Sequence, residues 1–361
     1  MAELESLKGV EELCDEDLES EGSTTGCFKW KPTSEQHLIK AESCMLKVVK
    51  CPLKKLYVDL PSGERLWTVI ANPDVNDKIP LVMLHGFGGG IGFWAMNYEA
   101  LSKDRPVYTF DLLGFGRSSR PKFNDSPEEA EEIFIQSIED WRKSVKINKM
   151  ILLGHSFGGY LASLYALKYP KRVTSLILAD PWGFPVPKPE DLERLPWWIK
   201  LILRCVEPFN PLAIIRCCGP VGPRLIKRSR RDFKQRFPEV TEQNKNAVTE
   251  YIYHCNAGRP SGESAFKQLN QHVGYAVNPM INRIDKLDAN IPVTFIYGAK
   301  SWMDRSSGEI VKDLIPNKVT IHVLEGEVGH HVYADDPDHF NGHVLDTCNE
   351  ADGTSLDVCN N

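Results

Sequence analysis

Ser156 is the residue of this chain with the clearest potential to act as a nucleophile. It lies in the run Gly154-His-Ser-Phe-Gly158, between the apolar residues 150–153 and the helix-like residues 160–167. A strand that reverses into a helix within a few residues strains the backbone of the turn residue, and small flanking residues leave room for that turn. Because a serine hydroxyl alone is a weak nucleophile, we expect a base, an acid that orients the base, and donors for an oxyanion.

The expected base and acid follow later in the chain. The apolar run 293–297 ends at Gly298, and Asp304 follows in a polar loop as the predicted acid. The last apolar run, 319–324, leads to a loop with two adjacent histidines. We predict that His330 is the base and His331 its neighbour, because the loop glycine directly precedes His330. The order Ser156, Asp304, His330 is that of a known class of serine hydrolases.

A glycine-rich loop upstream is the expected oxyanion site. Residues 80–84 read as a buried strand and run into His85-Gly-Phe-Gly-Gly-Gly90. In such sites one backbone donor comes from this loop and the other from the residue after the nucleophile. We therefore assign the N–H groups of Phe87 and Phe157 to the oxyanion hole. We interpret His85 and His155 as polar packing around the turn, and Asp111 as a residue that fixes a loop.

Asp335 has two interpretations. Asp335-Asp336-Pro337 is typical of a helix start, with Asp336 as N-cap and Pro337 at the first helical position. His330 and Asp335 also form an H-x-x-x-x-D pair, a motif shared by glycerolipid acyltransferases of unrelated fold. Because the triad already needs His330, the pair is weak evidence for a separate acyltransferase site.

Strands that alternate with helices must position these residues. Residues 55–60 and 66–71 predict a hairpin around Pro61-Ser-Gly63, and alternation then continues to residue 182, which is typical of a mostly parallel sheet covered on both faces. The stretch before the next strand is far longer than a crossover needs, so we expect a cap above Ser156. The expected organisation is an acidic disordered arm at 1–26, an N-terminal segment at 27–52, a core at 53–182 and 290–348, a cap at 183–289 and a flexible tail at 349–361.

Five blocks of the chain resemble a known family. They are 85–119, 154–160, the string Asp-Pro-Trp-Gly-Phe-Pro at 180–185, 297–308, and 329–340 with Gly-His-His-Val-Tyr-Ala-Asp. They are similar to the α/β-hydrolase branch that holds an N-acylphospholipid lipase and the lipid-droplet coactivator of adipose triglyceride lipase. The resemblance runs from about Phe28 to Thr347 and implies an α/β-hydrolase fold, with a mostly parallel eight-stranded sheet and an inserted helical cap. Lipase members of the branch keep the elbow serine, whereas the vertebrate coactivator has asparagine there.

Two segments indicate contact with lipid. In the resembling family the segment around Trp30 helps anchor the protein to lipid, but this chain has a single Trp there, so we expect weak anchoring. Within the predicted cap, an apolar stretch with Trp197 and Trp198 precedes a basic run that includes Arg228, Arg230 and Arg231. Either feature alone is compatible with core packing or a solvated helix face. Together they favour contact with lipid, because aromatic residues insert among acyl chains while Arg and Lys contact phosphate.

Composition is typical of one large domain. The net charge of −6 argues against a nucleic-acid partner. No apolar run approaches the length of a membrane span and no signal peptide opens the chain, so we expect a cytoplasmic protein, peripheral on lipid droplets or intracellular membranes. The ten Cys contain no C-x-x-C pair, which favours reduced thiols over a metal site. We expect neither a metal nor an organic cofactor.

Two hypotheses of function follow. In the first, the protein is a serine lipase that deacylates phospholipid, lysophospholipid or N-acylphospholipid, with water or a lysophospholipid resolving the acyl-enzyme. In the second, it is a lipid-droplet adaptor that co-activates a triglyceride lipase, with that lipase or a droplet-coat protein as partner. Ser156 favours the first hypothesis and disfavours haloalkane or epoxide chemistry, which needs a carboxylate at the elbow.

Overall fold

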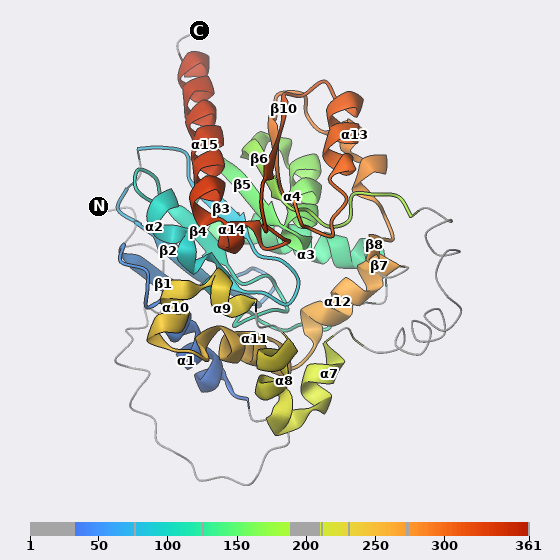
Figure 1. The fold of residues 1–361 in the computed structure, drawn as a ribbon. Coiled ribbons are helices and arrows are strands. Elements are labelled where there is room, and N and C mark those ends of the chain that lie inside the picture. Colours follow the sequence, from blue (N-terminus) through green and yellow to red (C-terminus); the bar gives the residue numbers. More distant parts are fainter. Residues whose placement is uncertain are drawn as a thin grey trace.

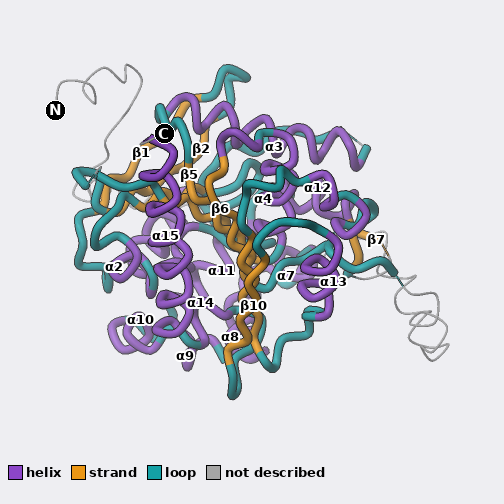
Figure 2. The backbone as a smooth tube through the Cα atoms, turned by 90° about the horizontal axis from the view of Figure 1, so that it is seen from above, coloured by secondary structure: helices purple, strands orange, loops and turns teal. Residues whose placement is uncertain are grey.

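The computed structural model describes residues 33–75, 77–124, 126–187, 210, 212–229, 232–271 and 274–359. A central sheet is covered by helices on both faces, and an insertion of short helices lies at one edge of this core (Figures 1 and 2). Among the described residues, none of the helices combines the length and apolar character that crossing a bilayer requires.

The sheet has eight strands in the order β1-β2-β4-β3-β5-β6-β9-β10. The first two strands form the predicted hairpin, and β2 pairs antiparallel with β4, whereas all other pairs are parallel. The sheet therefore has the mostly parallel, eight-stranded form predicted. The strands are β1 (Leu53–Asp59), β2 (Arg65–Ala71), β3 (Leu81–Leu84), β4 (Val107–Phe110), β5 (Met150–His155), β6 (Val173–Ala179), β9 (Val293–Gly298) and β10 (Val319–Leu324).

Alternate side chains of the central strands enter two different hydrophobic clusters. In β3, Val82 and Leu84 pack with one cluster, while Leu81 and Met83 pack with the other. Successive residues of a strand point to opposite faces, so an uninterrupted apolar run buries both faces. The helices that cover the two faces are α2 (Tyr98–Leu101), α3 (Pro127–Ser144), α4 (Phe157–Lys168), α13 (Ser306–Leu314), α14 (Val332–Asp335) and α15 (Pro337–Cys359), with the 3-10 turns η2 (Ile91–Met96) and η3 (Pro170–Arg172).

Helix α15 begins where the sequence predicts but continues further. Asp336 Oδ1 accepts the N–H of His339 at 3.3 Å, which is the predicted N-cap contact. The helix then runs to Cys359, so it includes most of the stretch 349–361 for which the sequence predicts a flexible tail. Burial explains the difference, because Cys348 and Ala351 pack into the core and Asp352 pairs with the buried Arg105 at 2.8 Å.

The insertion between β6 and β9 is the predicted helical cap. The longest helix in its described part, α11, packs against α1 (Glu35–Leu46) of the N-terminal segment, and the two lie side by side in Figure 1. Leu38, Ala41 and Met45 of α1 are buried, so this helix of the N-terminal segment is packed against the rest of the protein. The cap elements are α7 (Ala213–Cys217), η4 (Gly219–Val221), α8 (Gly222–Ser229), α9 (Phe233–Arg236), α10 (Pro238–Gln243), α11 (Ala247–Ala257), α12 (Ser261–Leu269), β7 (Asn270–Gln271), β8 (Tyr275–Ala276), η5 (Met280–Asn282) and η6 (Ile284–Lys286).

Candidate active site

Ser156 occupies a strained turn between β5 and α4. Its φ of 53° and ψ of −117° lie outside the regions that non-glycine residues usually adopt. The two flanking glycines permit this turn. A Cβ on Gly154 would lie 2.2 Å from the carbonyl oxygen of Gly158, and a Cβ on Gly158 would lie 2.4 Å from that of Leu84. The strand and the helix can therefore approach each other closely, and the serine is presented at the carboxyl end of β5.

His330 faces Ser156 from the loop after β10. Its Nε2 lies 3.0 Å from Ser156 Oγ, and its Nδ1 lies 2.5 Å from Asp180 Oδ2. With Nδ1–H donating to the carboxylate, the lone pair of Nε2 can accept the serine hydroxyl proton. The geometry matches that of a nucleophile, a base and an orienting acid.

The acid beside His330 is Asp180, which corrects the prediction of Asp304. Asp180 directly follows β6, with φ of 46°, and its side chain is fully buried. Asp304 is exposed, and its Oδ1 accepts the N–H of Ser306 at 3.0 Å near the start of α13. Strands β6 and β9 are parallel neighbours, so both aspartates follow strand ends at the same edge of the sheet. Chain order alone does not decide which carboxylate points at the base.

Burial changes the electrostatics of Asp180. It raises the pKa of this carboxyl from its ordinary value to about 7, while a hydrogen bond donated by Ser301 Oγ opposes the shift. Ser301 was not predicted from the sequence. It lies in the loop after β9 that also carries Asp304, so this loop supports the acid instead of supplying it.

Two other histidines have the packing roles expected of them. Nδ1–H of His85 donates to the carbonyl of Gly86 at 2.8 Å, and its Nε2 accepts the N–H of Leu112 at 2.9 Å. His155 Nε2–H donates to the backbone carbonyl of His330 at 2.9 Å, which supports the loop that carries the base. Burial lowers the pKa of His85 to about 4 and that of His155 to about 3, so both are neutral near pH 7. Asp111 fixes a loop, because its carboxylate accepts the N–H groups of Ile91 and Arg117.

The two assigned oxyanion donors lie on either side of the elbow. Phe87 is in a turn closed by the hydrogen bond from Gly89 N to Gly86 O at 3.1 Å, and Phe157 is the first residue of α4. Within the described residues, neither backbone N–H donates to another protein group. The first N–H groups of a helix have no partner inside the helix, so Phe157 is suited to contact an anion.

Asp335 contacts the loop that carries His330. One carboxylate oxygen accepts the N–H of Gly329 at 2.8 Å, and the other lies 3.1 Å from Arg236 Nε of the cap. His331 is a neighbour of the site, with its Nδ1 3.2 Å from the hydroxyl of Tyr333. Through its two contacts Asp335 joins the loop of His330 to the cap.

Of the residues assigned to lipid contact, the described part of the chain includes Arg228 alone. It is exposed on α8. Trp30, Trp197, Trp198, Arg230 and Arg231 lie outside the described residues.

Comparison with known proteins identifies the family. A profile described as alpha/beta hydrolase fold matches residues 79–337. The chain belongs to the α/β-hydrolase family.

Relatives within this family match nearly the whole chain. The chain is 50% identical over 322 residues to 1-acylglycerol-3-phosphate O-acyltransferase ABHD5 of Mus musculus, covering 89% of this chain and 91% of the relative. It is 46% identical to (lyso)-N-acylphosphatidylethanolamine lipase of Mus musculus, covering 89% and 94%. These matches confirm the resemblance to this branch of the α/β hydrolases.

Solved structures of other α/β hydrolases share the fold. Carboxylesterase CesB from Bacillus subtilis aligns with a TM-score of 0.62 at 15% identity, covering 87% of this chain and 97% of that one. A bacterial membrane phospholipase A aligns with a TM-score of 0.60 at 20% identity, covering 87% and 91%.

Proposed function

We propose that the protein is a serine hydrolase that cleaves carboxylic esters of lipids. The observation that carries this proposal is the alignment of Ser156 Oγ, His330 and Asp180 by contacts of 3.0 and 2.5 Å. Ser156 Oγ attacks the ester carbonyl while its proton passes to His330 Nε2. The N–H groups of Phe87 and Phe157 stabilise the oxyanion. The imidazolium then protonates the leaving alcohol, which departs as the acyl-enzyme forms.

The names of the relatives support a phospholipid or lysophospholipid as substrate. One group of relatives is named for acyl transfer to 1-acylglycerol-3-phosphate and the other for deacylation of N-acylphosphatidylethanolamine or its lyso form. On Ser156 of this chain both reactions would pass through one acyl-serine, which water resolves in hydrolysis and the acceptor hydroxyl resolves in acyl transfer. We propose phospholipid hydrolysis as the main reaction, with acyl transfer to lysophosphatidic acid at the same site.

The cap provides a surface suited to a membrane or a lipid droplet. Ile214, Val221 and Leu225 are exposed large apolar side chains of α7, η4 and α8. Arg224, Lys227 and Arg228 are exposed beside them. We refer to these six residues as the cap surface. Apolar side chains insert at an interface while basic side chains contact anionic head groups, so we propose peripheral binding to cytoplasmic faces of membranes or to droplets.

Acyl-enzyme trapping tests the proposed chemistry. Purified protein is mixed with phosphatidylethanolamine, N-acylphosphatidylethanolamine and lysophospholipids, and the intact mass of the protein and the released fatty acid are both measured. The proposal predicts an acyl adduct on Ser156 and fatty-acid release, both lost in Ser156→Ala and His330→Ala with unchanged melting temperature. Stimulation of a separate triglyceride lipase that survives Ser156→Ala, without fatty-acid release by the protein itself, would favour the adaptor function instead.

A further inference from the structure

Cap helix α11 holds the loop that carries one of the assigned oxyanion donors. Asn256 Nδ2 donates to the carbonyl of Gly88 at 2.8 Å and to the carbonyl of Ile252 at 2.9 Å. Tyr251, one and a half turns earlier on the same helix, accepts the N–H of Gly92 at its hydroxyl at 2.9 Å. The contact of Asn256 reaches the loop that contains Phe87, and the contact of Tyr251 reaches η2, which directly follows this loop.

Gly88 is the residue whose backbone geometry sets the direction of this turn. Its φ is +67°, at the third position of the turn from Gly86 to Gly89, where a positive φ favours glycine. A Cβ at Gly88 would lie 3.2 Å from Leu212 and 3.5 Å from Asn256 Oδ1, so cap side chains contact this turn directly. The peptide that joins Gly88 to Gly89 carries the carbonyl held by Asn256 and also the N–H that donates to Gly86 O at 3.1 Å. The carbonyl of Gly86 belongs to the same peptide as the N–H of Phe87.

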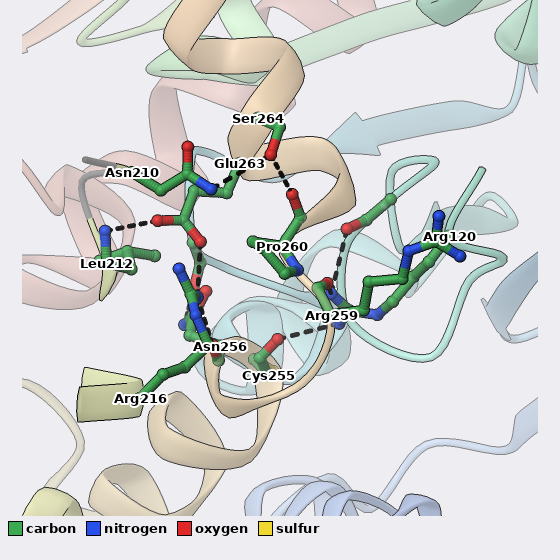
Figure 3. A network of polar contacts seen from close by, with 12 residues as sticks. Arg120, Asn210, Leu212, Arg216, Cys255, Asn256, Arg259, Pro260, Glu263 and Ser264 are labelled. Atoms are coloured by element: carbon green, nitrogen blue, oxygen red, sulfur yellow. Dashed lines mark hydrogen bonds and ion pairs between the residues drawn. The ribbon is translucent and has the colours of Figure 1, made fainter. Parts of the chain in front are cut away.

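A buried ion pair holds Asn256 in place from the cap side (Figure 3). Arg216 of α7 donates to Glu263 of α12 at 2.6 Å and to the backbone carbonyl of Asn256 at 3.0 Å. The second oxygen of Glu263 accepts the N–H of Leu212 at 2.6 Å. All three polar side chains are more than nine-tenths buried, and such a network tolerates little displacement of any member.

Arg120 locks the same end of α11 to the core (Figure 3). Its guanidinium donates to the cap carbonyls of Cys255 and Arg259 at 2.9 and 2.6 Å, and to the core carbonyls of Gly114 and Gly116 at 3.3 and 2.9 Å. A cation at the last carbonyls of a helix also compensates the helix dipole. The position of Asn256 relative to the core loop is therefore fixed by contacts on both sides.

We propose that Asn256 is a positioning residue for the oxyanion hole, so that the cap completes the active site as well as covering it. The cap holds the peptide from Gly88 to Gly89, whose N–H in turn holds the carbonyl of Gly86, and this pair of contacts fixes the direction in which the N–H of Phe87 points. This inference rests on the proposed function, because an oxyanion forms only if Ser156 attacks a carbonyl.

The test compares Asn256→Leu with Asn210→Leu. Leucine has nearly the shape of asparagine but cannot donate to Gly88. Asn210 is a matched control, because its Nδ2 donates at 3.2 Å to Ser264 Oγ within the cap and does not contact the core loop. The probes are p-nitrophenyl butyrate and a butyl trifluoromethyl ketone. The ketone adds to Ser156 Oγ, its carbonyl electron pair becomes an oxyanion, and the serine proton passes to His330.

For Asn256→Leu we expect kcat to fall about 10–100-fold and inhibition by the ketone to weaken by a similar factor, with KM little changed. Asn210→Leu should keep the wild-type values of kcat, KM and inhibition by the ketone. If Asn256→Leu does not fold, Asn256→Ser, whose hydroxyl is too short to reach Gly88, replaces it with the same expectation.

Unchanged kcat and ketone inhibition in a folded Asn256 variant would overturn the inference alone. A loss in kcat matched by Asn210→Leu would also overturn it, because the effect would then be general to the cap. Failure of the wild-type protein to hydrolyse the ester and to react with a fluorophosphonate at Ser156 would instead overturn the proposed function, and the inference with it.

Discussion

Three groups hold His330 in the orientation of a base. Ser156 contacts Nε2, Asp180 contacts Nδ1, and His155 donates to the backbone carbonyl. The third contact requires a protonated Nε2 on His155, which a neutral imidazole supplies when its other nitrogen is unprotonated. The site thus depends on a histidine that stays neutral because it is buried.

Burial of His85 and His155 predicts how stability depends on pH. Both have a lower pKa in the folded protein, about 4 and about 3, than the value of about 6.5 of an unfolded chain. As the pH falls below about 6.5, the unfolded chain binds protons that the folded chain does not, so stability is lost with acidification towards pH 4. Each such histidine contributes up to about 1.4 kcal/mol per pH unit in this window.

His85→Gln tests this linkage, since glutamine offers a donor and an acceptor but does not titrate. Urea unfolding at pH 6.5, 5.5 and 4.5 should show that the variant loses stability less steeply than wild type, by about 1 kcal/mol per pH unit. Parallel curves for the two proteins would contradict the prediction.

The sequence alone could predict that Ser156 and His330 lie together, but not which carboxylate lies beside them. Ser156 can be recognised from the sequence because glycines flank it between a strand and a helix. His330 can be recognised from its place in the loop after the last strand. The acid depends on which of two loops at the same sheet edge turns its carboxylate inward. Asp180 does so through a positive φ directly after β6, a backbone property that the string Asp-Pro-Trp-Gly does not reveal by itself.

At the scale of elements, ion pairs between residues far apart in the sequence help to determine where a helix ends and how it packs. The hydrophobic periodicity of the sequence does not show these features. Arg105 is completely buried, and both terminal nitrogens contact Asp352 of α15 at 2.8 and 3.3 Å. In the N-terminal segment, buried Glu42 of α1 contacts Arg117 at 2.9 Å. Each pair joins residues far apart in the sequence, so neither the end of α15 nor the packing of α1 could be predicted locally.

Removing one member of the first pair should destabilise the protein. Asp352→Ala leaves the guanidinium of Arg105 buried with weaker compensation, so we expect the free energy of unfolding to fall by about 3 kcal/mol. Asp346→Ala, an exposed position on the same helix, is the control and should have little effect. Chemical denaturation measures both, and equal stability of the two variants would show that the pair does not anchor α15.

At the scale of the molecule, the cap has an inner and an outer side. Its inner side contacts the loop of Phe87 and, through Arg236 and Asp335, the loop of His330. Its outer side carries the cap surface. In the proposed function, the same domain would bind a lipid interface and complete the active site.

Vesicle binding tests the outer side. Val221→Ser with Leu225→Ser should weaken binding to anionic vesicles at every salt concentration, because the lost contribution is apolar. Arg224→Glu with Arg228→Glu should weaken it mainly at low salt, since each basic residue near the surface contributes about 1 kcal/mol that salt screens.

The matched control is Ile310→Ser with Leu314→Ser, because these side chains are also exposed but lie on α13 of the core. The control should bind like wild type, and all forms should hydrolyse a short soluble ester equally. If the core variant lost binding and the cap variants kept it, the cap surface would not be the surface that binds lipid.

The central claim is that Ser156, His330 and Asp180 act together in ester hydrolysis, and two amide substitutions test it most directly. Hydrolysis of p-nitrophenyl butyrate by Asp180→Asn and by Asp304→Asn is measured side by side at pH 8. We expect Asp180→Asn to lose about 10⁴-fold in kcat, the magnitude known for such a change of the orienting acid, while Asp304→Asn keeps most of the wild-type rate. Near-wild-type hydrolysis by Asp180→Asn together with a large loss in Asp304→Asn would contradict the account.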